Sequence, residues 1–202
     1  MPGAGGAFFV AKLDPGGACT DVTSFGSAGS SAVWLAGVAS DSLGEAIVSG
    51  NLFSNITIGM ANLTAPGIFL AKFDLFGAPV WANGYAQPLS QPLRVPVAVQ
   101  SQTNGSIGLA ITCLAASNLG GVSLGAATSG ICAAQYDPSG AHLWSKQFAG
   151  SPGTPGIWTV AWDTASPALI MAGALTAPVD FGTGSLTGTN AYGDAFVAKV
   201  VP

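Results

Sequence analysis

The sequence predicts an all-β protein, and three features of its composition lead to that prediction. Charged residues make up only 7% of the 202 residues, against about 25% in an ordinary soluble domain, so helices with charged outer faces have little to be built from. The chain carries 29 Gly and 13 Pro, residues that form turns and interrupt regular structure. Apolar residues make up 49%, which excludes a disordered chain. Short strands joined by many turns satisfy all three observations.

A six-residue segment recurs four times and sets the period of the chain. It reads FVAKLD at residues 9–14, FLAKFD at 69–74, CAAQYD at 132–137 and FVAKVV at 196–201. Its lysine position falls at Lys12, Lys72, Gln135 and Lys199, in steps of 60, 63 and 64 residues. A fixed period of this kind indicates a repeat architecture. We interpret residues 1–202 as a single repeat domain, with copies at about 33–85, 94–148 and 157–202 and a leading half-repeat at 6–26.

Two turn motifs divide each copy into strands. The first three segments run into Asp-x-x-Gly turns, in which Asp accepts backbone hydrogen bonds and Gly adopts a positive φ, as we expect at Gly77 and Gly140. A second turn lies 26 or 27 residues after each Asp of the first, at Asp41, Gln100 and Asp163. The stretches between turns predict strands at 33–40, 45–53, 67–73 and 79–85, and about thirteen strands in the whole chain.

Four antiparallel strands per period are typical of a β-propeller blade, with a β-sandwich as the alternative that needs no sequence period. The chain then holds about three blades, whereas closed propellers typically need at least four. We therefore expect a piece of a longer propeller, an assembly with copies of itself, or two ends that complete one blade by strand exchange.

The composite repeat resembles the bacterial β-propeller repeat family, often described as seven-bladed. Its pattern is aromatic-x-Ala-Lys-x-Asp-x-x-Gly, then Trp, then a Val-Ala-x-Asp turn and a strand that ends in Gly, and it covers nearly the whole chain. The resemblance implies a propeller in a large secreted or surface-associated bacterial protein, and it implies no shared catalytic residues. The chain departs from the pattern at four positions, which are Asp21 for Trp, Gln135 for Lys, Gln100 for Asp and Val201 for Asp.

The charged residues are expected to serve the fold. Five of the nine acids lie in repeat phase and are expected to cap turns; they are Asp14, Asp41, Asp74, Asp137 and Asp163. A ring of such Asp residues around Ca²⁺ is the alternative, although no Asp-x-Asp-x-Asp loop is present. Residues two apart on a strand share a face, so Lys12 is expected to pair with Asp14 and Lys72 with Asp74. Glu45 is expected to be a solvated strand-end charge. We expect no metal, no cofactor and no catalytic residue.

The single histidine and the three cysteines carry no chemical motif. His142 follows a turn, without CxxC partners for zinc or a Gly-x-Ser-x-Gly elbow for a triad, and is expected to be solvated. Cys113 stands where the other copies have Gly50 and Gly173 on simple alignment, and Cys132 where they have Phe69 and Phe196. Their strands should be neighbours, but three cysteines are few and odd in number, so we expect both thiols to be reduced.

Three tryptophans are the candidate ligand-binding residues, namely Trp158, Trp162 and Trp34. Trp158 and Trp162 lie four apart on a predicted strand and are expected to face the same way. Val160 between them matches valines of the other copies, which indicates core. At the two tryptophan positions one copy has Ala36 and Ser40 and the other has Val95 and Val99, which leaves a sugar-stacking platform as the alternative to core packing.

The sequence predicts a non-catalytic binding or structural scaffold of a bacterial surface or secreted protein. The alternatives are a polysaccharide-acting hydrolase or lyase and a lectin-like sugar binder, each using loops on one propeller face. The partner is a protein or a glycan, because a net charge of −4 and one arginine, Arg94, exclude a nucleic-acid groove. No apolar stretch spans a membrane and no signal peptide is visible, so an extracellular or cell-surface location follows from the resemblance alone.

Overall fold

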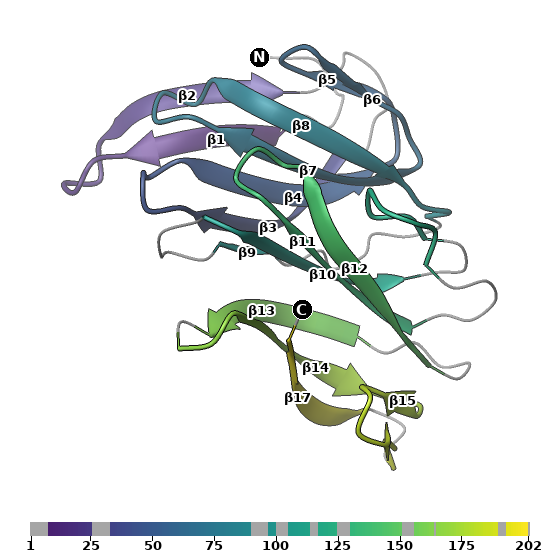
Figure 1. The fold of residues 1–202 in the computed structure, drawn as a ribbon. Coiled ribbons are helices and arrows are strands. Elements are labelled where there is room, and N and C mark those ends of the chain that lie inside the picture. Colours follow the sequence, from purple (N-terminus) through teal and green to yellow (C-terminus); the bar gives the residue numbers. More distant parts are fainter. Residues whose placement is uncertain are drawn as a thin grey trace.

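The structure is a computed structural model that describes residues 8–25, 33–89, 97–99, 105–113, 117–124, 130–150, 156–163, 165–189 and 193–201. All regular elements in these ranges are β-strands, and the strands pair antiparallel in successive sheets (Figure 1). The all-β, antiparallel prediction is therefore confirmed. Among the described residues, none belongs to a helix of the length and apolarity that crossing a membrane requires.

The sheets follow one another in chain order. A hairpin comes first, formed by β1 (Phe8–Leu13) and β2 (Cys19–Phe25). The next sheet has the order β3-β4-β7-β8, with strands Val33–Ser40, Ala46–Leu52, Gly67–Phe73 and Pro79–Ala86. Its successor has the order β9-β10-β11-β12, with strands Val97–Val99, Ile107–Cys113, Gly130–Tyr136 and His142–Ala149. A three-stranded sheet, β13-β14-β17, follows with strands Gly156–Asp163, Ala168–Leu175 and Asp194–Val200. The strands predicted for the first full copy are confirmed to within a residue or two.

Short hairpins connect the second and third strands of a sheet. They are β5 (Ile56–Ile58) with β6 (Ala61–Leu63), and β15 (Val179–Asp180) with β16 (Ser185–Leu186). The β9–β12 sheet has a single bridge between Ser117 and Leu124 in the same place. With the strands of these hairpins included, the described residues contain seventeen strands. The prediction of about thirteen missed them because strands of two or three residues are too short for an alternating pattern.

The hydrophobic core lies between successive sheets in three clusters. Phe8 and Phe25 of the first hairpin pack against Phe69 and Phe73 of β7. A second cluster joins the β3–β8 and β9–β12 sheets, and a third joins the β9–β12 sheet to β13, β14 and β17. The strands β7, β10 and β11 are buried along their whole length, and mostly apolar residues occupy them, as is usual for strands covered on both faces.

The first strands of the three larger sheets lie side by side, because β3 contacts β9 and β9 contacts β13. The outer face of the first hairpin is different. Phe9 is 65% exposed, whereas the equivalent residues Phe69 and Phe196 are buried. The described residues cover the hairpin only on the face of Phe8 and Phe25.

Candidate functional site

The in-phase aspartates cap turns, as predicted. The carboxylate of Asp74 accepts hydrogen bonds from the amides of Phe76 and Ala78 at 2.8 and 2.9 Å, and Gly77 has a φ of 75°. The Asp137 turn repeats this geometry, with a φ of 81° at Gly140. The hydrogen bond from the Ser139 hydroxyl, helped by backbone amides, lowers the pKa of Asp137. The described residues hold no group of three or more His, Cys, Asp or Glu that could bind a metal ion.

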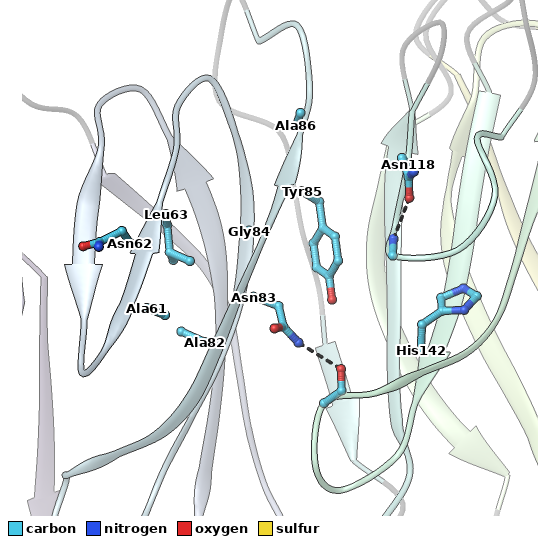
Figure 2. A pocket seen from close by; sticks show the side chains of 12 residues that line it. Ala61, Asn62, Leu63, Ala82, Asn83, Gly84, Tyr85, Ala86, Asn118 and His142 are labelled. Atoms are coloured by element: carbon cyan, nitrogen blue, oxygen red, sulfur yellow. Dashed lines mark hydrogen bonds between the residues drawn. The ribbon is translucent and has the colours of Figure 1, made fainter.

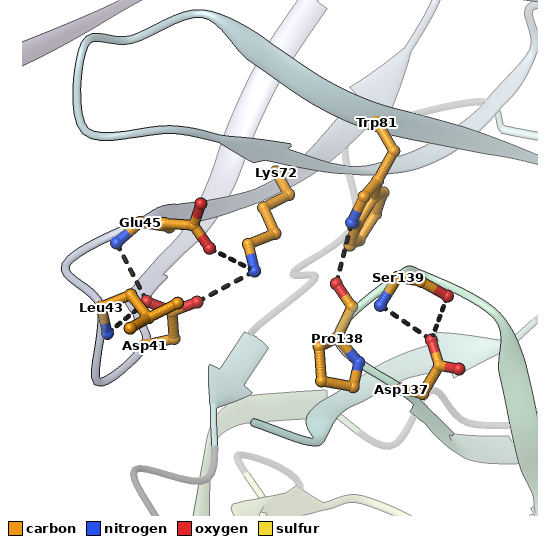
Figure 3. A network of polar contacts seen from close by, with 8 residues as sticks. All are labelled: Asp41, Leu43, Glu45, Lys72, Trp81, Asp137, Pro138 and Ser139. Carbon is orange, nitrogen blue, oxygen red and sulfur yellow. Dashed lines mark hydrogen bonds and ion pairs between the residues drawn. The ribbon is translucent and has the colours of Figure 1, made fainter. Parts of the chain in front are cut away.

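Lys72 pairs with a different turn from the one expected (Figure 3), and the predicted pair of Lys12 with Asp14 is also wrong, because Lys12 donates to the Leu75 carbonyl instead. The Lys72 ammonium lies 3.0 Å from Asp41 and 2.6 Å from Glu45, and the Lys72 and Asp41 side chains are only 8% and 7% exposed. Lys199 pairs with Asp163 in the same way. The predicted pairing of Lys72 with Asp74 is wrong because the carboxylate of Asp74 is held by its own turn. Glu45, predicted to be solvated, is a partner of Lys72.

The Asp-x-x-Gly turns at residues 74–77 and 137–140 also contact the preceding sheet. The indole Nε1 of Trp81 donates a hydrogen bond to the carbonyl of Pro138 at 3.1 Å (Figure 3). At the preceding junction, Lys12 Nζ donates to the carbonyl of Leu75 at 3.0 Å. Leu75 and Pro138 occupy the same position after the Asp of their turns. We call this contact the turn lock, and it joins successive sheets at equivalent points.

A cleft of about 660 Å³ opens beside the second turn lock, between two sheets (Figure 2). One wall consists of β6 and of Ala82–Ala86 of β8, and the other wall of Asn118, Gly120, Gly140 and His142. Asn83 Nδ2 donates a hydrogen bond to the Gly140 carbonyl at 2.9 Å and so ties the walls together at one end. Asn118 accepts the amide of Gly120 at 2.7 Å.

The polar residues around this cleft are departures from the repeat. Strand register places Tyr85 where the other copies have Phe25 and Phe148. It likewise places Tyr136 where they have Leu13 and Phe73. Burial raises the pKa of both phenols, and for Tyr85 hydrogen bonds with Tyr136 and Asn83 partly oppose it. The hydroxyl groups therefore stay neutral and act as hydrogen-bonding groups.

His142 supports the cleft rather than standing in solvent. It pairs across the strands with Tyr136, and the two rings meet edge to face with centroids 6.0 Å apart. A Cβ added at Gly121 would lie 2.8 Å from its Nε2, so only glycine lets the loop pack on the imidazole. Nε2 is buried and has no hydrogen-bond partner among the described residues. The prediction of a solvated turn histidine is wrong, because a loop of its own repeat covers it.

The three candidate tryptophans do not form one surface. Trp158 is 56% and Trp34 55% exposed, whereas Trp162 is half-buried against the core and touches the Gly108 position of β10. The register of β13 shifts between Ile157 and Thr159, so Trp158 is an extra, bulged residue. The expectation that Trp158 and Trp162 face the same way is wrong for this reason. Val160 is buried, as predicted.

Cys113 and Cys132 form a disulfide, with Cα atoms 5.5 Å apart, so the prediction of reduced thiols is wrong. Register also corrects the alignment of Cys113. Cys132 faces Ile111, whereas its copy Phe69 faces Gly50, so Cys113 stands at the position of Leu52 and not of Gly50. The connection before β10 is longer than the one before β4, which misled the count by two residues.

Comparisons with known proteins give no assignment: no protein-family model and no curated protein matches the chain. The resemblance to bacterial β-propeller repeats therefore depends on the repeat residues quoted above. The cleft residues Asn83, Tyr85 and Asn118 were missed from the sequence. The signal that could have found Tyr85 is a tyrosine at the position where the other copies have Phe25 and Phe148.

Proposed function

We propose that this chain is a non-catalytic scaffold built of β-propeller repeats, which binds a protein or a glycan on a surface formed by successive sheets. The observation that carries this proposal is that most of the carboxylates hold turns of the backbone or pair with a lysine. Six aspartates accept backbone amides of their own turns, and they are Asp14, Asp41, Asp74, Asp137, Asp163 and Asp180. Glu45 pairs with Lys72, and Asp194 accepts hydrogen bonds from Thr189.

Glycoside hydrolysis ordinarily requires two carboxyl groups that face each other across the scissile bond. Here six of the nine acids hold the backbone of their own turns, and the two acids that lie together, Asp41 and Glu45, share the ammonium of Lys72. This distribution favours a structural use of the acids over the alternative of a polysaccharide-acting hydrolase or lyase.

The arrangement of the sheets supports the propeller part of the proposal. Two sheets have four antiparallel strands in sequential order, and the first strands β3, β9 and β13 are neighbours. Blades around a common centre would pack their first strands in this way, which favours a propeller. We further propose an extracellular or cell-surface location, which the disulfide supports because such bonds persist in oxidising compartments.

The test is an assay of turnover. The chain is incubated with neutral and acidic polysaccharides, and reducing ends and the ultraviolet absorbance of unsaturated products are measured. We expect no product above the protein-free control. Product formation that disappears in a carboxylate-to-amide variant such as Asp194→Asn, with an unchanged melting temperature, would show that the scaffold proposal is wrong.

A further inference from the structure

We propose that the cleft between β8 and the loop at 117–124 binds a short, uncharged oligosaccharide. This inference deepens the binding role proposed above and rests on it. The cleft lies at the junction where polar residues replace the apolar residues of the other copies, namely Tyr85 and Tyr136. The other copies form the same strands with apolar residues at these two positions, so polar residues gathered at one junction indicate a task that the other junctions do not share.

The charge of the lining defines the class of ligand. Among the residues that the structure describes, those that line the cleft include no Asp, Glu, Lys or Arg. This described lining therefore offers no cation to replace the counterions of a phosphate, a sulfated glycan or a nucleic acid. Amides and a phenol remain, and these groups recognise neutral ligands that are rich in hydrogen-bonding groups.

The shape of the cleft suits an elongated ligand. Its volume of about 660 Å³ falls within the range of small-molecule sites, about 300–1,000 Å³. A second hollow of about 370 Å³ shares Ala61 and Ala82 with it and continues past Met60 and Val80. The two hollows therefore lie in series along β8, as successive sugar units of a chain would.

The two walls offer complementary hydrogen-bonding groups. Asn118 uses its Oδ1 on the Gly120 amide, which leaves its Nδ2 to donate. Asn83 Nδ2 donates to the Gly140 carbonyl, and the Asn83 amide also interacts with the Tyr85 hydroxyl, so these two side chains form a polar pair on the opposite wall. Figure 2 shows Tyr85 between these two amides, with its hydroxyl directed toward the level of Asn83. A sugar hydroxyl both donates and accepts, so donors and acceptors on facing walls fit it.

The loop that carries Asn118 is held in place before any ligand arrives. The hydroxyl of Tyr136 donates to the carbonyl of Leu119 at 2.9 Å. Gly120 approaches Tyr85 closely, since a Cβ there would lie 3.2 Å from Cε1 of that ring. Tyr136 and His142 are thus positioning residues, and a preorganised wall lowers the entropic cost of binding.

The experiment uses the whole chain and four uncharged trisaccharides as probes: cellotriose, maltotriose, laminaritriose and chitotriose. Because His142 is the sole histidine of the chain and lines the cleft, its imidazole signals in NMR report occupancy without any mutation. We expect these signals to shift in a saturable manner with at least one probe. Calorimetry on the same samples gives the affinity.

Two variants test the residues. Asn118→Asp keeps the oxygen that caps Gly120 and removes the Nδ2 donor, and Tyr85→Phe restores the residue of the other copies. Loss of one hydrogen bond to a neutral ligand corresponds to roughly a fivefold to tenfold weaker affinity. We expect at least that loss for Asn118→Asp, and a threefold or greater loss for Tyr85→Phe.

Two controls separate this site from other surfaces. Trp34 is 55% exposed and lies outside the cleft lining, so Trp34→Ala should bind normally. Trp158→Ala should also bind normally, because that tryptophan belongs to the other candidate platform. Absence of binding by all four probes at millimolar concentration, binding of anionic glycans alone, or loss of binding in Trp158→Ala alone would each overturn the inference. Turnover of a probe would instead contradict the scaffold proposal.

Discussion

The ammonium group of Lys72 lies 3.0 Å from the carboxylate of Asp41, which caps the turn between β3 and β4. The third strand of the sheet is thereby fastened to the turn between its first two strands. Lys199 and Asp163 repeat the pair. In the remaining copy the sequence has glutamine at both positions, Gln135 and Gln100, so the two charges are present together or absent together.

This pairing predicts a coupled effect of substitution. Lys72→Gln leaves two acids in a mostly buried place without their cation, and we expect a loss of about 3 kcal/mol in the free energy of unfolding. The double variant Asp41→Gln with Lys72→Gln copies the neutral pair and should be more stable than Lys72→Gln alone by about 1 kcal/mol. Denaturation in urea measures both. Lys12→Gln is the control, since that lysine is exposed and should cost below about 1 kcal/mol. Strict additivity of the two single variants would refute the coupling.

The same carboxylates predict a dependence of stability on pH. Burial disfavours the charged form of Asp41, but hydrogen bonds from Lys72 and from the amides of Glu45 and Leu43 outweigh it, so its pKa is lowered. A group with a depressed folded-state pKa stabilises the fold above its unfolded pKa of about 3.9, and this stability is lost as the pH falls through the folded value. We expect the melting temperature to drop steadily below about pH 5, and to drop less in Asp41→Asn. Parallel profiles for the two proteins would contradict this assignment.

The disulfide predicts a thiol count and a change in stability. Cys19 is exposed and free, so the denatured, unreduced chain should react with one equivalent of a thiol reagent, and the reduced chain with three. Cys113 and Cys132 are 19 residues apart, and a loop of that length corresponds to roughly 3 kcal/mol. Reduction should therefore lower the melting temperature of the Cys19→Ala variant as much as that of the parent. Three reactive thiols without reductant would exclude the bond.

Two glycines with the same backbone conformation distinguish the cost of a positive φ in a non-glycine residue from the cost of a steric clash with a neighbouring side chain. Gly17 has a φ of 83° with open space around a Cβ, whereas Gly140 has a φ of 81° and a Cβ there would lie 2.9 Å from Cδ2 of Trp81. Gly17→Val should cost the strain of a left-handed residue, about 1–2 kcal/mol. We expect Gly140→Val to cost at least 1 kcal/mol more, because the turn lock must open. Equal melting temperatures of the two variants would contradict a steric clash with Trp81.

The exposed apolar side chains of the first hairpin predict association of the isolated chain. Phe9, Leu13 and Val22 are all more than half exposed. Apolar strands with few charges pair readily with other chains. Light scattering at micromolar concentration should report a mass above that of one chain, and a clean monomer without dye-accessible apolar surface would contradict the prediction.

Local rules predicted the strands and turns well, and failed where the answer depended on distant residues. The turn at Asp74 follows from four consecutive residues, so its geometry could be read from the sequence. The partner of Lys72 could not, because two acids compete for it and the nearer one is already held by its own turn. The cleft also depends on contacts between sheets, as Asn83 and Asn118 come from different copies.

The turn lock joins successive sheets at equivalent positions but uses a different donor group at each junction. Leu75 and Pro138 present equivalent carbonyl groups, yet one is met by the ammonium of Lys12 and the other by the indole of Trp81. At the corresponding site of β12, the indole of Trp144 already donates to Gln135. The two junctions therefore reach the same carbonyl position with donors from different repeat positions, so an exchange of one copy for another would change the donor at a junction.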